Sequence, residues 1–587
     1  MHKQELVQCL KPVPRAVSKE TLASVLFEIC KNINTPRSLA VWILYESGEF
    51  SQLVSLDIDA TNYRDAQAFA DDYLVTKFLS KYPDFAHAEL DPEGVALHSF
   101  YEFEEMCRRT NSKFDKLKED PQLWDPSMRS VFELARRKIA FVLGHSPDLV
   151  SISQGFGWGP GANTSSTGSY TSAYIKFQSR LDVTSNSLMM GHCCVNSNPA
   201  WVNCQLQTDE IPSVAVSLTR EAFNIVRGNE IVFVPKNAKT HRIIAKEPTV
   251  NSYLQKGFGN EIRALLRRFA GIDLKDQTTN QKLAKEGSLT GTLATIDLRG
   301  ASDTIARALV EFLLPSKWYL LLDRIRSKQG KLRLKDGDRW IYYHKFSSMG
   351  NACTFELESL IFWALCKACL ELRGQEQTLN VYGDDIIVPS DAFEDVSAVI
   401  DYAGFEVNTK KSYASGPFRE SCGKDYFLGT DVRPIFLKES ISNVESIFKL
   451  ANSVRRYGHR RNLGYGCDYR LYPVWSYLYG RVQPHFQGFK IPDGVGDSGF
   501  ISNWDEALPT LKRPAGRREG WEGFVYRCIT RHPVKQVMRD SHAGYTALLS
   551  VIGSEEPLLG HHDLRSATFP KETRSHIHGW CDLGPWV

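Results

Sequence analysis

Apolar residues recur at helical spacing through the first quarter of the chain. Leu22–Ile33 and Ser130–Leu143 both carry them every three or four positions, which predicts amphipathic helices. Charge-rich stretches such as Arg108–Asp120 separate these helices. We therefore expect residues 1–150 to be mostly helical.

Two apolar segments further along the chain predict strands that carry acidic residues. Leu293–Leu298 is a short strand that contains Asp297, and a buried strand rarely holds a carboxylate without a partner or a metal. Thr378–Pro389 has apolar β-runs on both sides of Gly383-Asp384-Asp385, which predicts a hairpin with an acidic pair at its tip. Adjacent carboxylates repel each other unless a cation neutralises them.

The elements around this hairpin predict how its carboxylates are assembled. A helix is expected from about Ala352 to Leu372, a second over Asp391–Ala403, and a strand over Phe405–Asn408. This βαββαβ order is typical of an antiparallel sheet with two helices on one face, and such a sheet places Asp297 beside Asp384. Three carboxylates at one sheet end would suit two Mg²⁺ ions roughly 3.5–4 Å apart, the arrangement of two-metal phosphoryl transfer. The alternative is a structural hairpin with incidental acids.

A second hairpin is predicted to carry basic residues. Glu230–Val234 is predicted to form a strand and is followed by a β-like segment that is flanked by prolines. Its four cations are Lys236, Lys239, Arg242 and Lys246. They indicate either a basic face or a protected sheet edge.

Composition excludes several classes of protein. Hydrophobic residues make up 42% of the 587 residues and charged residues 24%, with a formal net charge of +3, so the chain is neither disordered nor fibrous. No apolar run reaches the roughly 18–20 residues that span a bilayer, and the first residues do not resemble a signal peptide, so we expect neither a membrane nor an exported protein.

The 13 scattered cysteines favour a reducing cytoplasm over a disulfide scaffold. Two groups of residues have side chains of the type that binds zinc, but buried or free thiols are the favoured interpretation of both. These groups are the Cys366/Cys369 pair and the cluster of His192, Cys193, Cys194 and Cys204.

The last 140 or so residues combine basic pairs with aromatic residues. Basic pairs such as Arg455-Arg456 and Arg517-Arg518 suit phosphate contacts, although each could be a solvated face. Aromatic and arginine side chains alternate over Asp468–Lys490, where rings could stack on bases. Trp475 and Tyr479 are also spaced like a buried helix face, and core packing is favoured there. The Gly- and Ser-rich loop Ser153–Ser172 lacks the pattern of a phosphate-cradling P-loop, and an approach to RNA or nucleotide is the less favoured interpretation.

Five segments together resemble motifs A to E of RNA-directed RNA polymerases, specifically the replicase subunit of the small positive-strand RNA bacteriophages (the levivirus group). The segments are ATIDLRGASD, FSSMGNACTFELESLIFWAL, VYGDDIIVP, AGFEVNTKKSY and GPFRESCGKDYFLGTDVRPIF. VPKNAKTHRIIAKEP resembles the basic motif F of that family. The resemblance is dense from about residue 230 to 436 and faint at both ends.

This resemblance implies an α+β right-hand fold and a division of the chain into four parts. Residues 1–150 would be a helical region that contributes to the fingers or bridges to them, and residues 151–290 the fingers with motif F. Residues 291–440 would be the palm with motifs A to E, and residues 441–587 the thumb and C-terminal region.

The resemblance also implies roles for individual residues. Asp297 and Asp384 would be the principal metal ligands, with Asp385 as ligand or neighbour, and Lys410 or Lys411 would protonate the pyrophosphate. The expected nucleotide contacts are Lys236, Lys239 and Arg242 at the triphosphate, and Ser302, Asp303, Gly350 and Asn351 near the ribose. The expected RNA contacts are Arg455, Arg456, Trp475 and Arg513.

The implied activity is synthesis of RNA on a single-stranded RNA template from NTPs, with two Mg²⁺ ions or Mn²⁺ in their place. The implied partners are the host elongation factors Tu and Ts and a ribosomal small-subunit protein, in the cytoplasm of a bacterial host. A reverse transcriptase is the alternative within polymerases, although such enzymes usually have an aromatic residue where this chain has Ser302-Asp303. A non-catalytic RNA-binding or assembly protein is the alternative of another class, although the three aspartates are all present.

One residue departs from the family pattern. Small residues usually follow the motif A Asp-Leu, whereas this chain has Arg299, which could pair with a carboxylate or a phosphate. We expect Arg299→Ser to retain polymerisation.

Overall fold

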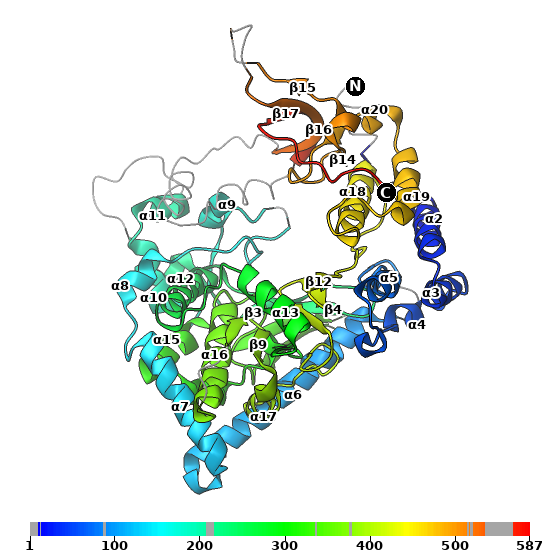
Figure 1. Cartoon of the computed structure of the whole chain (residues 1–587). Coiled ribbons are helices and arrows are strands. Elements are labelled where there is room, and N and C mark those ends of the chain that lie inside the picture. The colour runs from blue at the N-terminus through cyan, green and yellow to red at the C-terminus, as the bar shows by residue number, and fades with distance from the viewer. Residues whose placement is uncertain are drawn as a thin grey trace.

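The computed structural model describes residues 10–11, 13–85, 90–168, 170–206, 217–334, 337–374, 378–513, 516, 521–533 and 568–587. Helices and strands alternate along the chain in a mixed α+β fold, which confirms the predicted class (Figure 1). No helix among these residues is long and apolar enough to cross a membrane.

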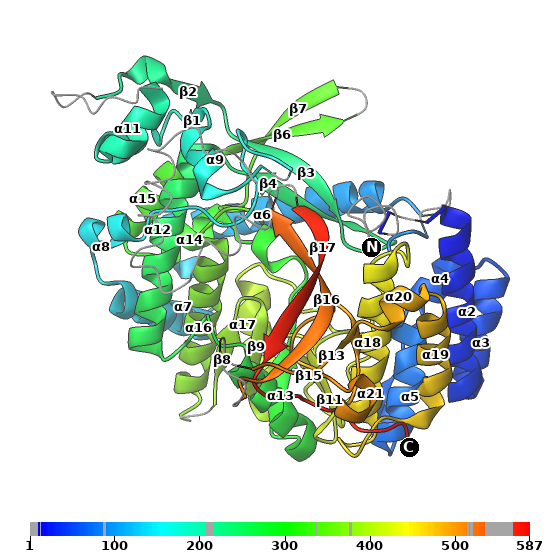
Figure 2. The same ribbon diagram turned by 90° about the horizontal axis from the view of Figure 1, so that it is seen from above.

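The first helices pack against the C-terminal third of the chain and not against the segments that follow them. Leu22, Leu74 and Phe78 share one hydrophobic cluster with Phe448 and Val454. Figure 2 shows the helices that carry these residues side by side. The helices that meet there are α2 (Arg15–Ile33), α3 (Pro36–Glu46), α4 (Phe50–Ser55) and α5 (Ala66–Lys77) on one side, and α18 (Val444–Arg461) and α19 (Tyr472–Gly480) on the other.

The next two helices diverge from this group. α6 (Pro92–Glu119) packs on α14 (Arg307–Leu313), which Figure 2 labels beside it, and α7 (Pro126–Leu143) packs on α16 (Thr354–Leu372), which lies beside it in Figure 1. The predicted helices are therefore present, but residues 1–150 split between two parts of the molecule.

A three-stranded antiparallel sheet, here the central sheet, has the order β5 (Leu293–Ile296), β9 (Asp385–Pro389), β8 (Asn380–Tyr382). Because strand side chains alternate, Ile386 and Val388 join the core that contains α16 and α17 (Phe393–Tyr402), whereas Ile387 packs on Ala284. Ala284 belongs to α13 (Thr278–Thr290), so the second face is also covered by a helix. The sequence did not predict this helix.

The strand expected over Phe405–Asn408 is reduced to isolated bridges. Leu298 pairs with Val407 and Thr295 with Tyr413, both antiparallel to β5. The five residues 408–412 lie between the two bridges and interrupt the ladder, so a continuous fourth strand cannot form. The prediction of a regular strand was wrong, although its position at the edge of β5 is as expected.

A four-stranded sheet, here the outer sheet, contains the basic hairpin. Its order is β4 (His241–Lys246), β3 (Asn229–Pro235), β6 (Gln329–Leu334), β7 (Gly337–Tyr342), and β3–β4 are antiparallel as predicted. The β6–β7 hairpin lies inside the segment 291–440, yet it pairs with β3. This segment is therefore not a single structural unit.

The remaining helices and strands lie before and after the central sheet in the sequence. Figure 2 shows the long pair of β16 (Phe524–Pro533) and β17 (Thr568–Ile577) beside α18 and α20 (Pro484–Gln487). The elements before the central sheet are α8 (Leu149–Gln154), α9 (Ala173–Gln178), β1 (Leu181–Thr184), α10 (Leu188–Asn196), α11 (Pro199–Leu206), β2 (Phe223–Val226) and α12 (Thr249–Leu265). Those after β5 are α15 (Ser316–Ile325), β10 (Phe418–Ser421), β11 (Lys424–Phe427), β12 (Thr430–Asp431), α20 (Pro484–Gln487), β13 (Lys490–Ile491), β14 (Phe500–Ile501), α21 (Trp504–Ala507), β15 (Thr510–Leu511), β16 (Phe524–Pro533) and β17 (Thr568–Ile577).

Candidate active site

Three aspartates lie at one end of the central sheet. Ile296 of β5 pairs with Ile386 of β9, so the next residue of β5, Asp297, lies at the same edge as Asp385. The turn from β8 to β9 requires Gly383, whose φ is +63° and where a Cβ would lie 2.5 Å from the ring of Phe355. This turn carries Asp384.

Burial and mutual repulsion make these carboxylates unusually hard to ionise. Burial raises the pKa of Asp297, and the charge of Asp384 raises it further. Burial also raises the pKa of Asp384, and burial together with Asp384 raises the pKa of Asp385 to about 6. Asn408 donates to Asp297 at 2.8 Å and Ser421 to Asp385 at 3.2 Å. A cation at this edge would favour the ionised forms of all three.

Two lysines from separate segments face this edge. Lys411 Nζ lies 3.8 Å from Asp297 Oδ2. Burial lowers the pKa of Lys411, but the carboxylates around it outweigh burial, and the net pKa is raised. Lys236 follows β3, and its pKa is lowered by burial and by the neighbouring Lys411 and Arg242.

The other two lysines that the sequence singled out face a different region. Lys239 in the β3–β4 turn has a pKa lowered by burial and by the charge of Lys77. The charge of Asp57 raises this pKa and that of Lys410 lowers it, so both residues lie near Lys239. Lys410 thus lies toward α5, away from the position of Lys411, although the two are adjacent in sequence. A fourth cation of the hairpin, Lys246, is paired with Glu230 at 2.8 Å.

The chemistry of the three carboxylates suits a hard divalent cation, because all their donors are oxygens. Among the described residues, no three His, Cys, Asp or Glu side chains already lie close enough together to hold a metal ion. Binding would therefore require the aspartate side chains to turn toward a common point. The same finding covers His192 and its neighbouring cysteines, and Cys366 and Cys369 are free buried thiols in α16.

Ser302 and Asp303 follow β5 and already have partners. Ser302 donates to Glu358 of α16 at 2.8 Å. Asp303 accepts from Lys345 at 2.8 Å, and Lys345 is also 3.5 Å from Glu104 of α6. Lys345 is 1% exposed, so this is a buried ion-pair cluster. Asp303 is held in place and is not a free side chain.

The loop before α16 packs on the basic hairpin. Ala245 of β4 donates its N–H to Met349 O at 2.8 Å, and a Cβ on Gly350 would lie 2.2 Å from Ala245 O. Asn351 accepts from the N–H of Cys353 at 3.0 Å and is buried. The loop, the hairpin and the carboxylate edge thus form one continuous region.

Sequence reasoning missed Glu358, Lys345 and Glu104. Burial and the charge of Asp384 raise the pKa of Glu358 to about 8. The sequence did contain a sign of Glu358, because this glutamate lies inside the apolar segment that forms α16. The other two residues are 241 positions apart in sequence, and no local pattern links them.

Arg299 pairs with two carboxylates. Its guanidinium lies 2.5 Å from Glu102 of α6 and 3.0 Å from Glu406. Of the two roles left open for it, pairing with carboxylates is the one observed.

The proposed RNA contacts differ in how accessible they are. Arg455 is fully buried and paired with Glu506 at 2.7 Å, so its assignment as an RNA contact was wrong. Arg456 pairs with Asp493 and Asp497, whereas Arg513 is exposed. The pair Arg517-Arg518 lies outside the described residues.

Trp475 packs between Tyr472 and Tyr479 with nearly parallel rings, and it contacts the core around α18, as core packing predicts. Residues 155–168 form a loop as predicted, which Lys176 holds through the carbonyls of Gly159 and Gly161.

Comparison with known proteins identifies the family. Residues 34–513 match the model of the RNA replicase, beta-chain family. The chain is 36% identical over 479 residues to the RNA-directed RNA polymerase subunit beta of Qbeta virus (strain MX1), covering 81% of this chain and 76% of that protein. It is 41% identical over 344 residues to the RNA-directed RNA polymerase beta chain of Escherichia phage MS2, covering 59% and 60%.

Solved structures give a more distant similarity. The BmCPV RNA-dependent RNA polymerase at elongation state matches with a TM-score of 0.37 and 10% identity, over 60% of this chain and 33% of that one, which is too remote to support an argument. The assignment therefore rests on sequence: the chain belongs to the RNA replicase beta-chain family of RNA bacteriophages.

Proposed function

We propose that this chain is the catalytic RNA-directed RNA polymerase subunit of a phage replicase, and that its reaction takes place at the edge formed by Asp297, Asp384 and Asp385. Family membership supports the activity, and the meeting of these three carboxylates at one sheet edge supports the site. The central sheet with α16 and α17 would be the palm, the outer sheet part of the fingers, and α18 to β17 the thumb.

The three aspartates would hold two Mg²⁺ ions, which lower the pKa of the attacking 3′-hydroxyl and stabilise the charge on the leaving pyrophosphate. Lys236, Lys239 and Arg242 would bind the triphosphate from the neighbouring hairpin. Lys411 is the better placed of the two lysines to protonate pyrophosphate, because its ammonium already faces Asp297.

The ribose of the incoming nucleotide would meet polar groups. Ser302 reaches Glu358, Asp303 is fixed by Lys345, and Asn351 lies in the adjoining loop. A polar gate of this kind can accept a 2′-hydroxyl, which favours NTPs over dNTPs. This arrangement supports an RNA polymerase over a reverse transcriptase.

The decisive experiment uses the purified chain, labelled NTPs and an RNA template that ends in cytidine, with and without a divalent cation. We expect template-length RNA only when the cation is present, with Mg²⁺ or Mn²⁺. Preferential incorporation of dNTPs would indicate a reverse transcriptase, and absence of any synthesis would favour an RNA-binding or assembly role.

A subunit of a replicase acts with partners, and the family resemblance suggests elongation factors Tu and Ts and a ribosomal small-subunit protein in the bacterial cytoplasm. Co-purification of the tagged chain from a bacterial host tests this proposal. An active preparation free of host proteins would show that the chain does not depend on them.

A further inference from the structure

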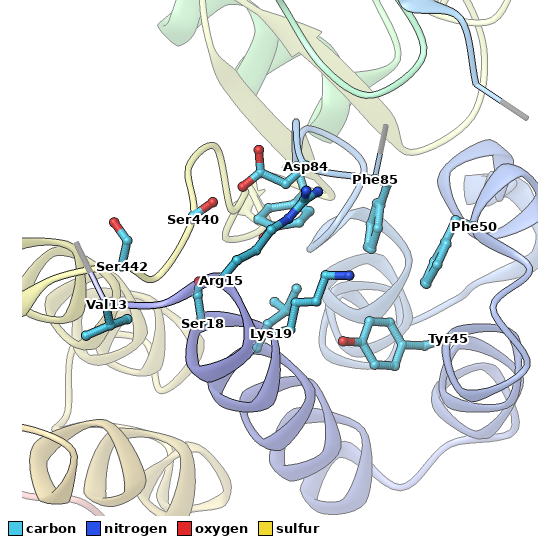
Figure 3. A pocket seen from close by; sticks show the side chains of 12 residues that line it. Val13, Arg15, Ser18, Lys19, Tyr45, Phe50, Asp84, Phe85, Ser440 and Ser442 are labelled. Atoms are coloured by element: carbon cyan, nitrogen blue, oxygen red, sulfur yellow. The ribbon is translucent and has the colours of Figure 1, made fainter. Parts of the chain in front are cut away.

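A cavity of about 360 Å³ lies far from the carboxylate edge in sequence, between the start of α2, the α3–α4 pair, the segment after α5 and the segment before α18 (Figure 3). Its volume falls at the lower end of the range for small-molecule sites. Its polar lining includes Arg15, Ser18 and Lys19, and its aromatic lining includes Tyr45, Phe50 and Phe85.

The first turn of α2 gives one wall of this cavity a positive character. The helix has 19 residues, and its N-cap residue, Pro14, makes no side-chain hydrogen bond to the first N–H groups. It also has no acidic residue in the first turn. A long helix that begins this way has unsatisfied N–H groups and a positive dipole end, which favour an anion.

Two cations reinforce this effect. Arg15 and Lys19 are four residues apart on α2, so their side chains share one face of the helix. Figure 3 shows the Lys19 side chain extending toward the rings of Tyr45 and Phe85, and the Arg15 side chain extending toward Asp84. Within the described parts of the chain, neither side chain has an ion-pair partner, and both are exposed.

Ser18 supplies an independent sign of a missing ligand. Its side chain is 4% exposed, and its hydroxyl has no hydrogen-bond partner among the described residues. Helical serines that are buried usually bond to a backbone carbonyl one turn earlier. An unpartnered hydroxyl in the cavity wall, beside two unpaired cations, is suited to a phosphate oxygen.

The opposite wall is a rigid aromatic surface. Phe50 and Phe85 stack with ring centroids 4.6 Å apart, and Tyr45 meets Phe50 edge-on at 5.9 Å. Phe85 is buried and Phe50 is partly exposed, so Phe50 carries the exposed part of this aromatic wall. A nucleobase can stack on aromatic side chains without regard to its identity. Asp84 also lines the cavity. The lining therefore has two positive side chains, Arg15 and Lys19, and one negative side chain, Asp84.

The cavity wall and the basic hairpin contribute to one large hydrophobic cluster. Ala238, in the turn between β3 and β4, belongs to the same cluster as Tyr82 and Phe85.

We propose that this cavity is a second nucleotide-binding site, in which the α2 N-terminus, Arg15, Lys19 and Ser18 bind phosphate while Phe50 and Phe85 contact the base. The ligand is a nucleotide, either a free nucleoside triphosphate or one unit of a single-stranded RNA. This binding requires neither metal nor polymerisation, so it can be measured independently of the proposed activity.

The test is equilibrium binding of ATP, and separately of a uridine hexanucleotide, to the full-length chain in EDTA, where no RNA is made. We expect Arg15→Ala/Lys19→Ala to weaken binding at least about tenfold, because it removes two charge-assisted contacts. Lys31→Ala is the matched control, since Lys31 lies in the last turn of the same helix, and it should bind as the wild type does. Ser18→Ala should weaken binding by a smaller factor.

The two probes distinguish the source of the nucleotide. Charge-dependent binding of ATP indicates a free triphosphate site, and binding of the hexanucleotide alone indicates an RNA strand. Equal binding by wild type and the double variant with both probes would overturn the proposal, as would an equal loss in Lys31→Ala. Binding of an acidic peptide but of neither nucleotide would show a protein-docking site instead.

Discussion

Replacement of Lys411 by Gln tests whether this residue is the proton donor, and the neighbouring Lys410→Gln is its matched control. The two residues have the same chemistry, but Lys411 Nζ lies 3.8 Å from Asp297 Oδ2. The charge of Lys410 instead lowers the pKa values of Asp57 and Lys239, on the side of α5. Only the first change should therefore affect the chemical step.

The expected magnitude separates two possible roles of Lys411. Its side chain is 54% exposed and that of Asp297 28%, so solvent screens the ion pair, and such a pair is worth up to about 1 kcal/mol, or roughly fivefold in rate. Positioned general acids contribute typically about 10²–10⁴-fold. A loss of more than a hundredfold thus indicates proton donation, and a loss of about fivefold indicates charge alone.

The assay is single-turnover incorporation of one nucleotide on a preformed RNA template, with circular dichroism and thermal unfolding as controls for the fold. We expect Lys410→Gln to lie within a few fold of wild type. Equal losses in the two variants, or a larger loss for Lys410→Gln, would refute the assignment of Lys411.

Three further substitutions test the surroundings of the site. Arg299→Ser should retain polymerisation and cost about 0.5–2 kcal/mol in urea unfolding, because it removes only half-exposed pairs with Glu102 and Glu406; loss of incorporation in a folded variant would contradict this. Lys345→Met should lower the free energy of unfolding by about 3–5 kcal/mol, because it leaves the carboxylates of Glu104 and Asp303 without their buried cation. Wild-type stability of this variant would show that the ion pairs of Lys345 do not stabilise the fold. The pKa of Glu358 is about 8 in the folded chain, against an ordinary glutamate value of 4.5. Between these two pH values the folded chain holds one proton more than the unfolded chain, so the free energy of unfolding of the wild type should fall as pH rises through this window. Glu358→Gln should lack this slope in urea unfolding with EDTA, and an unchanged slope would show that Glu358 is not its source.

Local sequence pattern was sufficient for the elements that carry the carboxylates. β8 and β9 flank Gly383-Asp384, with Asp385 as the first residue of β9, and α16 follows a polar entry loop. The hairpin and the helix were both predicted close to their observed bounds. The meeting of Asp297 with this hairpin followed from the order of strands and helices.

Long-range packing was not predictable in the same way. β6 and β7 join the outer sheet beside β3, and α2 packs against α19, because of contacts between segments about 100 and 450 residues apart that leave no periodic signal. Lys410 and Lys411 could not be separated by spacing, because their directions depend on how residues 408–412 interrupt the bridges to β5.

Primer extension by Asp384→Asn measures the central claim most directly. Asp391→Asn is its matched control, because Asp391 lies beyond the opposite end of β9 and its side chain is 56% exposed. The account predicts that Asp384→Asn folds, yet adds no nucleotide at any Mg²⁺ or Mn²⁺ concentration, while Asp391→Asn extends the primer as the wild type does. Extension by Asp384→Asn at a rate close to that of wild type would contradict it.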